Sequence, residues 1–502
     1  MGMFIHFAPN TWQNSEYDNL STPPSVINPN INTDQWAECA LKLGAKYVVF
    51  VAKHAGGFCM WQTQTTNYGI RNTPWKGGRG DVMADLAASC RKRGLKLGVY
   101  LSPQDREFGA GLAGRCKTAE KQAEYNRMYR EQLEEVVTRY GEIVEIWFDG
   151  SIVVPIGDIL QRYAPHAMIF QGPQATLRWV GNEEGFAPYP TWDPISEVDA
   201  KTGVATAIQG TPDGSVWLPV EADVSILRPY WFWSPTKQKN LVSLSDLEDI
   251  YYRSVGRGVQ MMLNLPPNSN GLMPDETCER AQEFGEGIRR RFGHSVAEGS
   301  GCGHSLVLKL ASPRRIDHVI LQEDCSQGQR VRAYRLDGNA KGKWTVLGRG
   351  TAIGHKRIQP VPPTVVRALR FVAEESAAEP IIRRFALFDT GIKPPLDWNA
   401  PVQVWADDKV GSWSDYRFRV DLSKKISAAA QYRLRFVAQG SSGLTIEKPE
   451  LRVGGVSEPD LVRPSSSEHD TLILTVTAVG QEVVIEGRIR GAEQGVMLLR
   501  RL

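Results

Sequence analysis

Over the first 292 residues, short apolar stretches alternate with amphipathic helical stretches, and this alternation constrains the fold more than any other feature of the chain. The apolar stretches are rich in β-branched and aromatic residues and end at glycine or polar residues, which is typical of buried strands. Strands buried on both faces occur mainly in parallel sheets covered by helices. The expected strands are Met3–Phe7, Tyr47–Lys53, Leu95–Ser102, Ile143–Asp149, Ala167–Gln171, Trp217–Ile226 and Gln260–Leu265.

The helical stretches carry apolar residues on one face and charged residues on the other. Thr118–Tyr140 is the clearest case, and similar stretches lie at Asp34–Leu43, Asp81–Arg93 and Leu244–Val255. Repeated strand–helix units of this number predict a (β/α)8-like barrel, irregular in its second half. A doubly wound sheet is the alternative, but no glycine-rich phosphate-binding loop follows the first strand.

Beyond the run Arg289–Arg291 the helical periodicity stops. Residues 295–390 alternate apolar and polar positions between glycine and proline residues, which predicts a β-sandwich. Gly391–Leu396 is proline-containing and is expected to be a stiff linker. The alternation then resumes. We therefore expect a multidomain chain, with a (β/α)8-like catalytic barrel over residues 1–292, a β-sandwich over 295–390 and a C-terminal β-sandwich over 397–502.

Composition excludes several classes of protein. The net charge of +3 over 502 residues lacks the basic excess of a nucleic-acid-binding protein. No stretch reaches the ~18 apolar residues of a membrane span. The seven cysteines show neither CxxC spacing nor a paired framework, so no metal site is expected. The chain opens on Met1–Phe7, which is strand-like and is no signal peptide. This opening fits a cytoplasmic protein, or a periplasmic or extracellular one whose leader precedes this numbering.

Chemistry-bearing residues gather at the ends of the expected strands. The apolar strand Ile143–Asp149 delivers one carboxylate, and an Asp is costly to bury unless it is paired or used. A barrel brings the carboxyl ends of its strands to one rim even though they are distant in sequence. The polar residues at or just past strand ends are His6, Lys53, His54, Asp105, Arg106, Asp149, Glu221, Asp223 and Asn264.

Tryptophans crowd the same half of the chain, among them Trp61, Trp147 and Trp217. Core packing explains most of them, but a sugar-binding cleft also uses aromatic faces beside fixed polar groups. Carboxylates, histidines, a carboxamide and Trp, without metal-ligand spacing or a nucleotide loop, suit hydrolysis of a glycosidic bond. No GxSxG motif is present, which disfavours acyl transfer.

Several motifs resemble the α-L-fucosidases of glycoside hydrolase family 29, over residues 1 to about 292. They are Gly2–Phe7, Lys53–His54, Gly57–Phe58, Trp61, Asn72–Asp81, Tyr100–Pro103, Trp147–Asp149 and Leu263–Pro267. The resemblance implies a barrel related to (β/α)8 and retaining hydrolysis of α-L-fucosides without a metal or other cofactor. The substrate is then a fucosylated oligosaccharide or glycan.

The resemblance also assigns roles. The family nucleophile falls on Asp149, in the WFD motif. Arg178–Glu183 is similar to the stretch that carries the acid/base in the branch acting on α-1,3/1,4-linked fucose of Lewis-type glycans. That places the acid/base on Glu183, with the adjacent Glu184 as its rival. His6 and His54 match residues that hold fucose hydroxyls. Trp217 and Glu221 fall in a sugar-lining segment, and Trp61 and Trp147 lie within the matched motifs, so all four are expected to bind the substrate.

Departures from the family pattern keep other functions open. Ala55 and Gly56 stand where the family often has His-Asp, Gln104 stands where an aromatic residue is common, and Ser234 replaces a frequent His. A fucosylated-glycan-binding protein with weakened catalysis is one alternative, and a glycosidase for another sugar is a second. Residues 295–390 resemble discoidin-like modules, which either dock on the barrel or bind carbohydrate.

Overall fold

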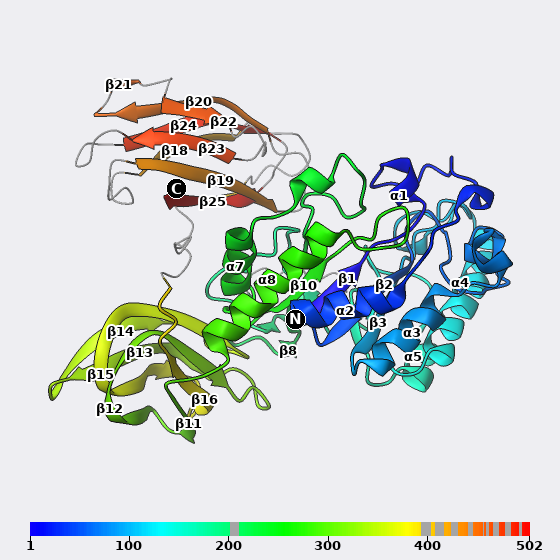
Figure 1. Cartoon of the computed structure of the whole chain (residues 1–502). Coiled ribbons are helices and arrows are strands. Elements are labelled where there is room, and N and C mark those ends of the chain that lie inside the picture. The colour runs from blue at the N-terminus through cyan, green and yellow to red at the C-terminus, as the bar shows by residue number, and fades with distance from the viewer. Residues whose placement is uncertain are drawn as a thin grey trace. The chain divides into compact units, whose positions relative to one another are not determined.

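The computed structural model describes residues 1–200 and 210–392, followed by the stretches 403–406, 416–422, 430–439, 445–454, 456–457, 461–464, 471–476, 483–490 and 494–501. The chain forms two compact units, Met1–Gly391 and Ile392–Leu502 (Figure 1). Most of the expected linker, residues 393–396, lies outside the described residues. The boundary between the two units falls at the start of that linker.

The first unit contains a nearly closed parallel barrel, which confirms the predicted fold class. Its eight described strands are ordered β5-β4-β3-β2-β1-β10-β9-β6. A parallel bridge between Phe170 and Leu177 links the two edges of this sheet. The strands are β1 (Gly2–Ile5), β2 (Tyr47–Lys53), β3 (Lys96–Leu101), β4 (Ile143–Trp147), β5 (Met168–Phe170), β6 (Arg178–Trp179), β9 (Val220–Ser225) and β10 (Gln260–Asn264).

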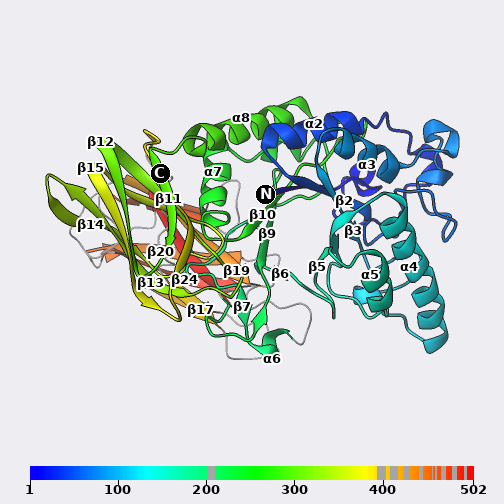
Figure 2. The same cartoon turned by 90° about the horizontal axis from the view of Figure 1, so that it is seen from below.

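Helices cover the outside of these strands (Figures 1 and 2). They are α2 (Thr33–Leu43), α3 (Val82–Lys92), α4 (Ala119–Arg139), α5 (Gly157–Tyr163), α7 (Leu244–Arg253) and α8 (Asp275–Phe292), with α1 (Asn10–Gln13) and α6 (Glu197–Ala200) as short additions. The side chains of Asn32, Asp81, Thr118 and Ser243 cap α2, α3, α4 and α7 by accepting a backbone N–H bond. Such caps satisfy N–H groups that a helix leaves unpaired, so each of these helices begins where its amphipathic pattern begins.

The second half of the barrel is irregular, as expected. No helix separates β5 from β6; the chain crosses directly from Phe170 to Arg178. The expected strand Trp217–Ile226 is divided into β8 (Val216–Trp217) and β9, because Pro219 lies between them and proline has no N–H to donate to a sheet. β8 pairs instead with β7 (Pro194–Ile195) in a small two-stranded antiparallel sheet.

A six-stranded antiparallel sheet follows the barrel within the first unit, in the order β11-β16-β12-β15-β13-β14. Both long strands, β12 and β15, contribute to one apolar core that includes Ile316, Tyr334 and Phe371. A single sheet encloses such a core by folding over itself. The strands are β11 (Ala297–Cys302), β12 (Ser305–Glu323), β13 (Val331–Ala340), β14 (Lys343–Gly350), β15 (Arg357–Ser376) and β16 (Ile381–Phe388).

The second unit is built of two antiparallel sheets, ordered β17-β25-β19-β23-β22 and β18-β24-β20-β21 in its described residues. Leu434, Leu451, Leu474 and Ile485 are buried in it. Across the described chain, no helix combines the length and apolar character needed to span a membrane. The strands are β17 (Gln403–Ala406), β18 (Tyr416–Asp421), β19 (Ala430–Gln439), β20 (Thr445–Val453), β21 (Val456–Ser457), β22 (Val462–Pro464), β23 (Thr471–Val476), β24 (Val483–Arg490) and β25 (Gln494–Arg501).

Candidate active site

Asp149 lies in the turn just after β4, at the rim formed by the carboxyl ends of the barrel strands. The hydroxyl of Tyr100, on β3, donates a hydrogen bond of 3.0 Å to its Oδ2. Water reaches Asp149 from the open side, but protein encloses its other sides. This desolvation raises the pKa of the carboxyl above its usual value, while hydrogen bonds from Tyr100 and the Gly150 backbone act in the opposite direction.

Glu183 reaches the same rim from the loop that follows β6. The indole N–H of Trp231 donates a 3.1 Å hydrogen bond to its Oε2. Partial enclosure raises the pKa of Glu183, and the Trp231 bond only partly offsets this. The negative charges of Asp149, Glu184 and Glu16 raise the pKa further, in that order. The two predicted catalytic carboxyls therefore lie within electrostatic reach of each other.

Glu184, the rival of Glu183, has a different environment. Its Oε2 lies 2.6 Å from Nη1 of Arg228, and both side chains are largely shielded from solvent. Its backbone pairs with Val224 of β9. The Glu184 carboxylate is therefore one half of a charge-assisted ion pair. The neighbouring residues thus differ, since Glu183 is held by a neutral donor and Glu184 by a cation.

His6, immediately after β1, is held by Asn264 at the end of β10. The Oδ1 of Asn264 lies 2.9 Å from His6 Nδ1, while its Nδ2 donates to Ser225 Oγ and to the backbone oxygen of Trp231. Because a backbone oxygen only accepts, these bonds orient the Asn264 amide. Nδ1 of His6 must then be the donor, and Nε2 carries the lone pair.

His54 follows β2 and lies close to His6, with ring centroids 6.0 Å apart. Its ring stacks on Tyr100 at 5.7 Å. Burial lowers the pKa of His54 to about 4 and that of His6 well below its usual value, so both rings are neutral near pH 7. Nδ1 of His54 is buried and has no hydrogen-bond partner among the described residues. A nitrogen that water cannot reach is equally out of reach of a sugar hydroxyl in this conformation.

Asp223 is a third carboxyl at this site, and its position near a strand end is the only sequence signal that marks it. It faces the barrel interior from β9 and accepts a 2.6 Å hydrogen bond from the Trp179 indole N–H. Burial raises its pKa well above the usual value, and the charges of Glu183 and Asp149 add to the effect. The rim therefore holds three carboxyls that oppose one another's ionisation.

The four other predicted substrate-binding residues differ in their burial and contacts. Trp61 is fully buried and donates to Glu135 of α4 at 2.7 Å. Trp147 is stacked on Phe170 with centroids 3.5 Å apart. Glu221 is buried near the amino end of β9, where it accepts a bond from Tyr47. Trp217 is 39% exposed in the β7–β8 hairpin.

The structure thus gathers His6, His54, Asp149 and Glu183 at one rim, whereas Trp61 and Glu221 are interior residues. Tyr100 and Trp231 join the site, although no sequence signal marked their hydrogen bonds to the two carboxyls. The strand pattern around Tyr100 predicts that this side chain is buried, but it does not indicate a hydrogen bond to Asp149. Among the described residues, no group of three His, Cys, Asp or Glu side chains is arranged to hold a metal ion.

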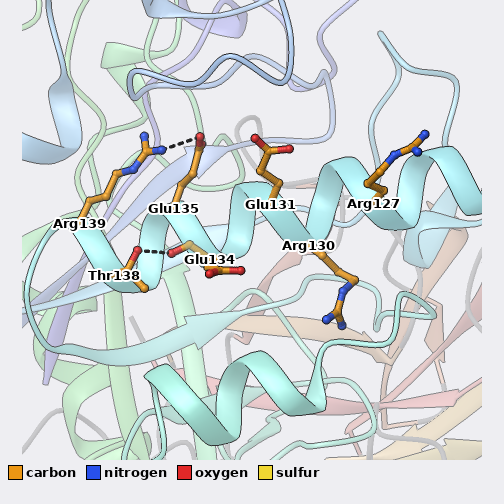
Figure 3. A pocket seen from close by; sticks show the side chains of 7 residues that line it. All are labelled: Arg127, Arg130, Glu131, Glu134, Glu135, Thr138 and Arg139. Atoms are coloured by element: carbon orange, nitrogen blue, oxygen red, sulfur yellow. Dashed lines mark hydrogen bonds and ion pairs between the residues drawn. The ribbon is translucent and has the colours of Figure 1, made fainter.

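A separate groove runs along the outer face of α4 (Figure 3). Every side chain that lines it comes from this one helix, and Arg139 pairs there with Glu135 at 2.8 Å. Arg130, at the same groove, pairs with the exposed Asp158. The Arg130–Asp158 pair joins α4 to α5, and Glu135 is a buried carboxylate that also accepts the bond from Trp61, so both pairs have a structural role. The groove shares no lining residue with the carboxyl cluster at the rim.

Comparisons with known proteins identify the family to which the chain is similar. The chain matches the family model described as alpha-L-fucosidase over residues 5–291. It is 32% identical to alpha-L-fucosidase 1 of Arabidopsis thaliana over 442 residues, which cover 77% of this chain and 85% of the plant protein. A glycoside hydrolase 29 fucosidase of Ruminococcus gnavus, solved with fucose, is similar at TM-score 0.69 and 26% identity, covering 78% of this chain and 92% of that one. A glycoside hydrolase 29 family member from an unknown rumen bacterium is similar at TM-score 0.71 and 26% identity, covering 100% of this chain and 97% of that one.

Proposed function

Because the chain belongs to the α-L-fucosidase family, we propose that it is an exo-acting, retaining enzyme that removes α-1,3- or α-1,4-linked fucose from Lewis-type oligosaccharides or glycans. Membership of the family makes it a glycoside hydrolase that acts on α-L-fucosides. The observation that carries the finer proposal is the pair Asp149 and Glu183, which lie on one rim and perturb each other's ionisation. Two carboxyls in such an arrangement suit a double displacement.

Asp149 is the proposed nucleophile. Its carboxylate attacks the anomeric carbon of fucose, the bond to the leaving oxygen breaks, and a covalent fucosyl-enzyme ester results. The Tyr100 hydroxyl supports this role, because its hydrogen bond stabilises the ionised form that attacks. As the ester forms, Asp149 loses its negative charge.

Glu183 is the proposed acid/base. Its raised pKa favours the protonated form in the first step, in which it gives a proton to the leaving oxygen. Once Asp149 is esterified, one of the charges that raised the pKa of Glu183 is gone. The pKa then falls, and the Glu183 carboxylate accepts a proton from the water that hydrolyses the ester. One carboxyl thereby serves as acid and then as base.

The ion pair with Arg228 argues against Glu184 in this role, because that carboxylate is already engaged by a guanidinium, whereas Glu183 is held by the indole N–H of Trp231. We expect Glu183→Gln to lower kcat/KM on a natural fucoside by about 10²–10⁴-fold, the usual contribution of a general acid. Glu184→Gln is the matched change one residue away and should cost far less. If Glu184→Gln is the more damaging variant, the assignment is reversed.

His6 and His54 are the proposed ligands of fucose hydroxyls. Nε2 of His6 presents a lone pair to a hydroxyl donor, and the His54 ring lies beside it, with its centroid 6.0 Å away. Trp217, on β8, is 39% exposed and is a proposed contact to the rest of the glycan. Trp61, Trp147 and Glu221 are buried, and we propose for them support of the site from within the barrel.

The linkage preference rests on Arg178–Glu183, which resembles the Lewis-active branch. Free L-fucose should be released from Lewis-type trisaccharides and not from 2′-fucosyllactose, and Asp149→Ala should abolish release. Release mainly from 2′-fucosyllactose would overturn the branch. Binding of a fucosylated glycan without any release would favour the alternative, a glycan-binding protein with weakened catalysis.

Retention is tested by proton NMR of the first product before it mutarotates. A double displacement yields α-L-fucose, whereas a single displacement yields the β anomer. In Asp149→Ala, added azide should restore turnover of an activated aryl fucoside by replacing the missing nucleophile. Appearance of β-L-fucose first, or no effect of azide on that variant, would contradict the double displacement.

A further inference from the structure

The loop that carries Glu183, residues 180–195, contacts both α7 of the barrel and the six-stranded domain formed by β11–β16. We infer that this domain positions Glu183 for catalysis by holding that loop and the helix end on which the loop rests. The inference depends on the proposed role of Glu183 as acid/base. It gives the domain a part in the reaction itself, in place of a separate carbohydrate-binding function.

On the barrel side, hydrogen bonds within the loop fix its shape, and contacts with Arg253 attach it to α7. Oδ1 of Asn182 accepts bonds from the backbone N–H groups of Glu184 and Phe186. The guanidinium of Arg253, at the end of α7, lies 5.0 Å from the centroid of the Phe186 ring. The backbone N–H of Ala187 donates to the oxygen of Arg253 at 3.0 Å. These bonds fix the loop relative to α7, so the position of Glu183 depends on where the end of α7 is held.

The six-stranded domain holds the loop at Tyr189 by two hydrogen bonds and a cation–π contact. The Tyr189 hydroxyl donates to the backbone oxygen of Ala352 at 3.1 Å and accepts from the backbone N–H of Thr351 at 2.9 Å. The guanidinium of Arg357 covers the ring, 4.0 Å from its centroid. Two hydrogen bonds and a cation–π contact on one ring leave it little freedom to shift.

A second group of contacts between the six-stranded domain and the loop lies at Trp192 and Asp193. Oε1 of Gln329 accepts a 2.8 Å bond from the backbone N–H of Asp193. The guanidinium of Arg332 lies 4.9 Å from the Trp192 ring and donates to the backbone oxygen of Pro212 at 2.7 Å. Trp192, Asp193 and Gln329 are each only 6% exposed. This interface is dry, unlike the solvated groove of a carbohydrate-binding surface.

The same domain also reaches the turn after α7. The backbone N–H of Ile358 donates to the oxygen of Gly256 at 3.0 Å, and Arg357 donates to that oxygen as well. Arg257 in this turn bonds the backbone oxygen of Ala187. The six-stranded domain, the end of α7 and the loop that carries Glu183 therefore form one closed set of contacts. A displacement of about 1 Å at an acid/base can lower the rate about 10²-fold. Contacts that keep Glu183 in place therefore affect the rate of the reaction.

The test compares Gln329→Ala and Arg332→Ala with a matched control, Arg370→Ala. Arg370 resembles Arg332, because each pairs with an aspartate (Asp337 at 2.8 Å for Arg370, Asp213 at 3.0 Å for Arg332) and lies over a tryptophan (Trp344 at 4.6 Å for Arg370, Trp192 at 4.9 Å for Arg332). Both of these partners of Arg370 are inside the six-stranded domain, whereas Asp213 and Trp192 are on the barrel side. Within its own domain Arg332 donates to the backbone oxygen of Gln329. Loss of general stability should therefore affect both arginine variants, and displacement of the loop only one.

The readout is kcat/KM on two substrates. A Lewis-type trisaccharide has a poor leaving group that needs the proton of Glu183, and a 2-chloro-4-nitrophenyl α-L-fucoside has a good one that does not. We expect Gln329→Ala with Arg332→Ala to lose about 10- to 100-fold on the trisaccharide and far less on the aryl fucoside. Arg370→Ala should lose equally little on both. Equal losses on the two substrates in the double variant would overturn the inference.

Glu183→Ala is measured beside these variants to separate the two proposals. If Glu183→Ala shows the dependence on leaving group and the double variant does not, the positioning role fails while the acid/base role stands. If Glu183→Ala itself shows no such dependence, the acid/base assignment fails and the positioning role fails with it. Azide should raise kcat of the double variant on the aryl fucoside, because azide needs no base to attack the ester.

Discussion

Tyr100 is the residue on which the ionisation of Asp149 most visibly depends. Desolvation makes the carboxylate harder to form, and the Tyr100 hydroxyl makes it easier by donating to Oδ2. The tyrosine is itself held between the rings of His54 and Trp147, at centroid distances of 5.7 and 6.4 Å. Its hydroxyl is therefore aimed at the nucleophile before any substrate binds.

Tyr100→Phe should raise the pKa of Asp149 further, because the bond removed stabilises the charged form. The reaction needs Asp149 ionised, so the acidic limb of the kcat/KM–pH profile should move to higher pH. On that limb we expect a loss of roughly tenfold, the worth of a hydrogen bond to a charged group. A pH series on an aryl fucoside measures this. An unchanged acidic limb would show that Tyr100 does not control Asp149.

At this scale, the sequence predicted which residues lie at the rim better than it predicted their depth. Asp149 and His6 follow strands, and the topology alone brings them together. Glu221, Asp223 and Ser225 alternate along β9 and all face the barrel interior, so the pattern could not tell which lies near the sugar. That depth depends on the stagger between strands, which is a property of the closed barrel. The indole donors Trp179 and Trp231 likewise become visible only when distant segments meet.

Among the elements, β2 and α4 are joined by a buried charge. Nζ of Lys53, at the end of β2, lies 3.1 Å from Asp105 and 2.9 Å from Oε1 of Gln132 on α4. Both charged side chains are shielded from water, at 0% and 3% exposed. The network ties a strand, the loop after β3 and a covering helix together on the flank next to His54.

Lys53→Met should be strongly destabilising, because it leaves Asp105 buried without its cation. We expect a cost of about 3–5 kcal/mol, as for other broken buried pairs. Lys121→Met is the control, since its pair with Glu124 on α4 is about half exposed and should be worth less than about 1 kcal/mol. Urea unfolding followed by tryptophan fluorescence compares the two. Similar midpoints would show that the buried pair adds nothing to stability.

The predicted elements match where local signals are strong. The helix Thr118–Tyr140 is observed as α4, with Thr118 as its cap, and Tyr47–Lys53 is observed as β2 without change. β6 escaped prediction because two residues carry no periodicity, and it forms only by pairing with β9. Its neighbour β9 was predicted too long, since pattern alone did not show that Pro219 interrupts the strand.

For the whole molecule, the boundary at Gly391 has a testable meaning. All residues proposed for catalysis lie between His6 and Asn264, and Met1–Gly391 is a compact unit with its own core. A chain ending at Gly391 should fold and retain kcat/KM on a small aryl fucoside within about threefold. A chain ending at Phe292 would lose the contacts at Tyr189 and Trp192 and should be far less active. An inactive or insoluble product of the first truncation would show that the unit does not fold alone.

The three-domain division remains a prediction, because the contacts group the barrel and the six-stranded domain into one unit. Alternating strands in both later segments were evident from the sequence, since surface-facing and core-facing residues alternate there. The interface between the barrel and the six-stranded domain was not evident from the sequence. It depends on single residues such as Arg332 and Gln329, whose partners lie more than a hundred positions away.

The pairing of β1 with β10 has a consequence for the timing of folding. Gly2 pairs with Met262, so this contact joins the two ends of the barrel sequence and closes a very long loop. Such a contact carries a high entropic cost and forms slowly. His6 meets Asn264 across the same seam. We therefore expect recovery of activity to lag behind recovery of helical circular dichroism during refolding, so that a nascent chain with most of its secondary structure would still be catalytically silent.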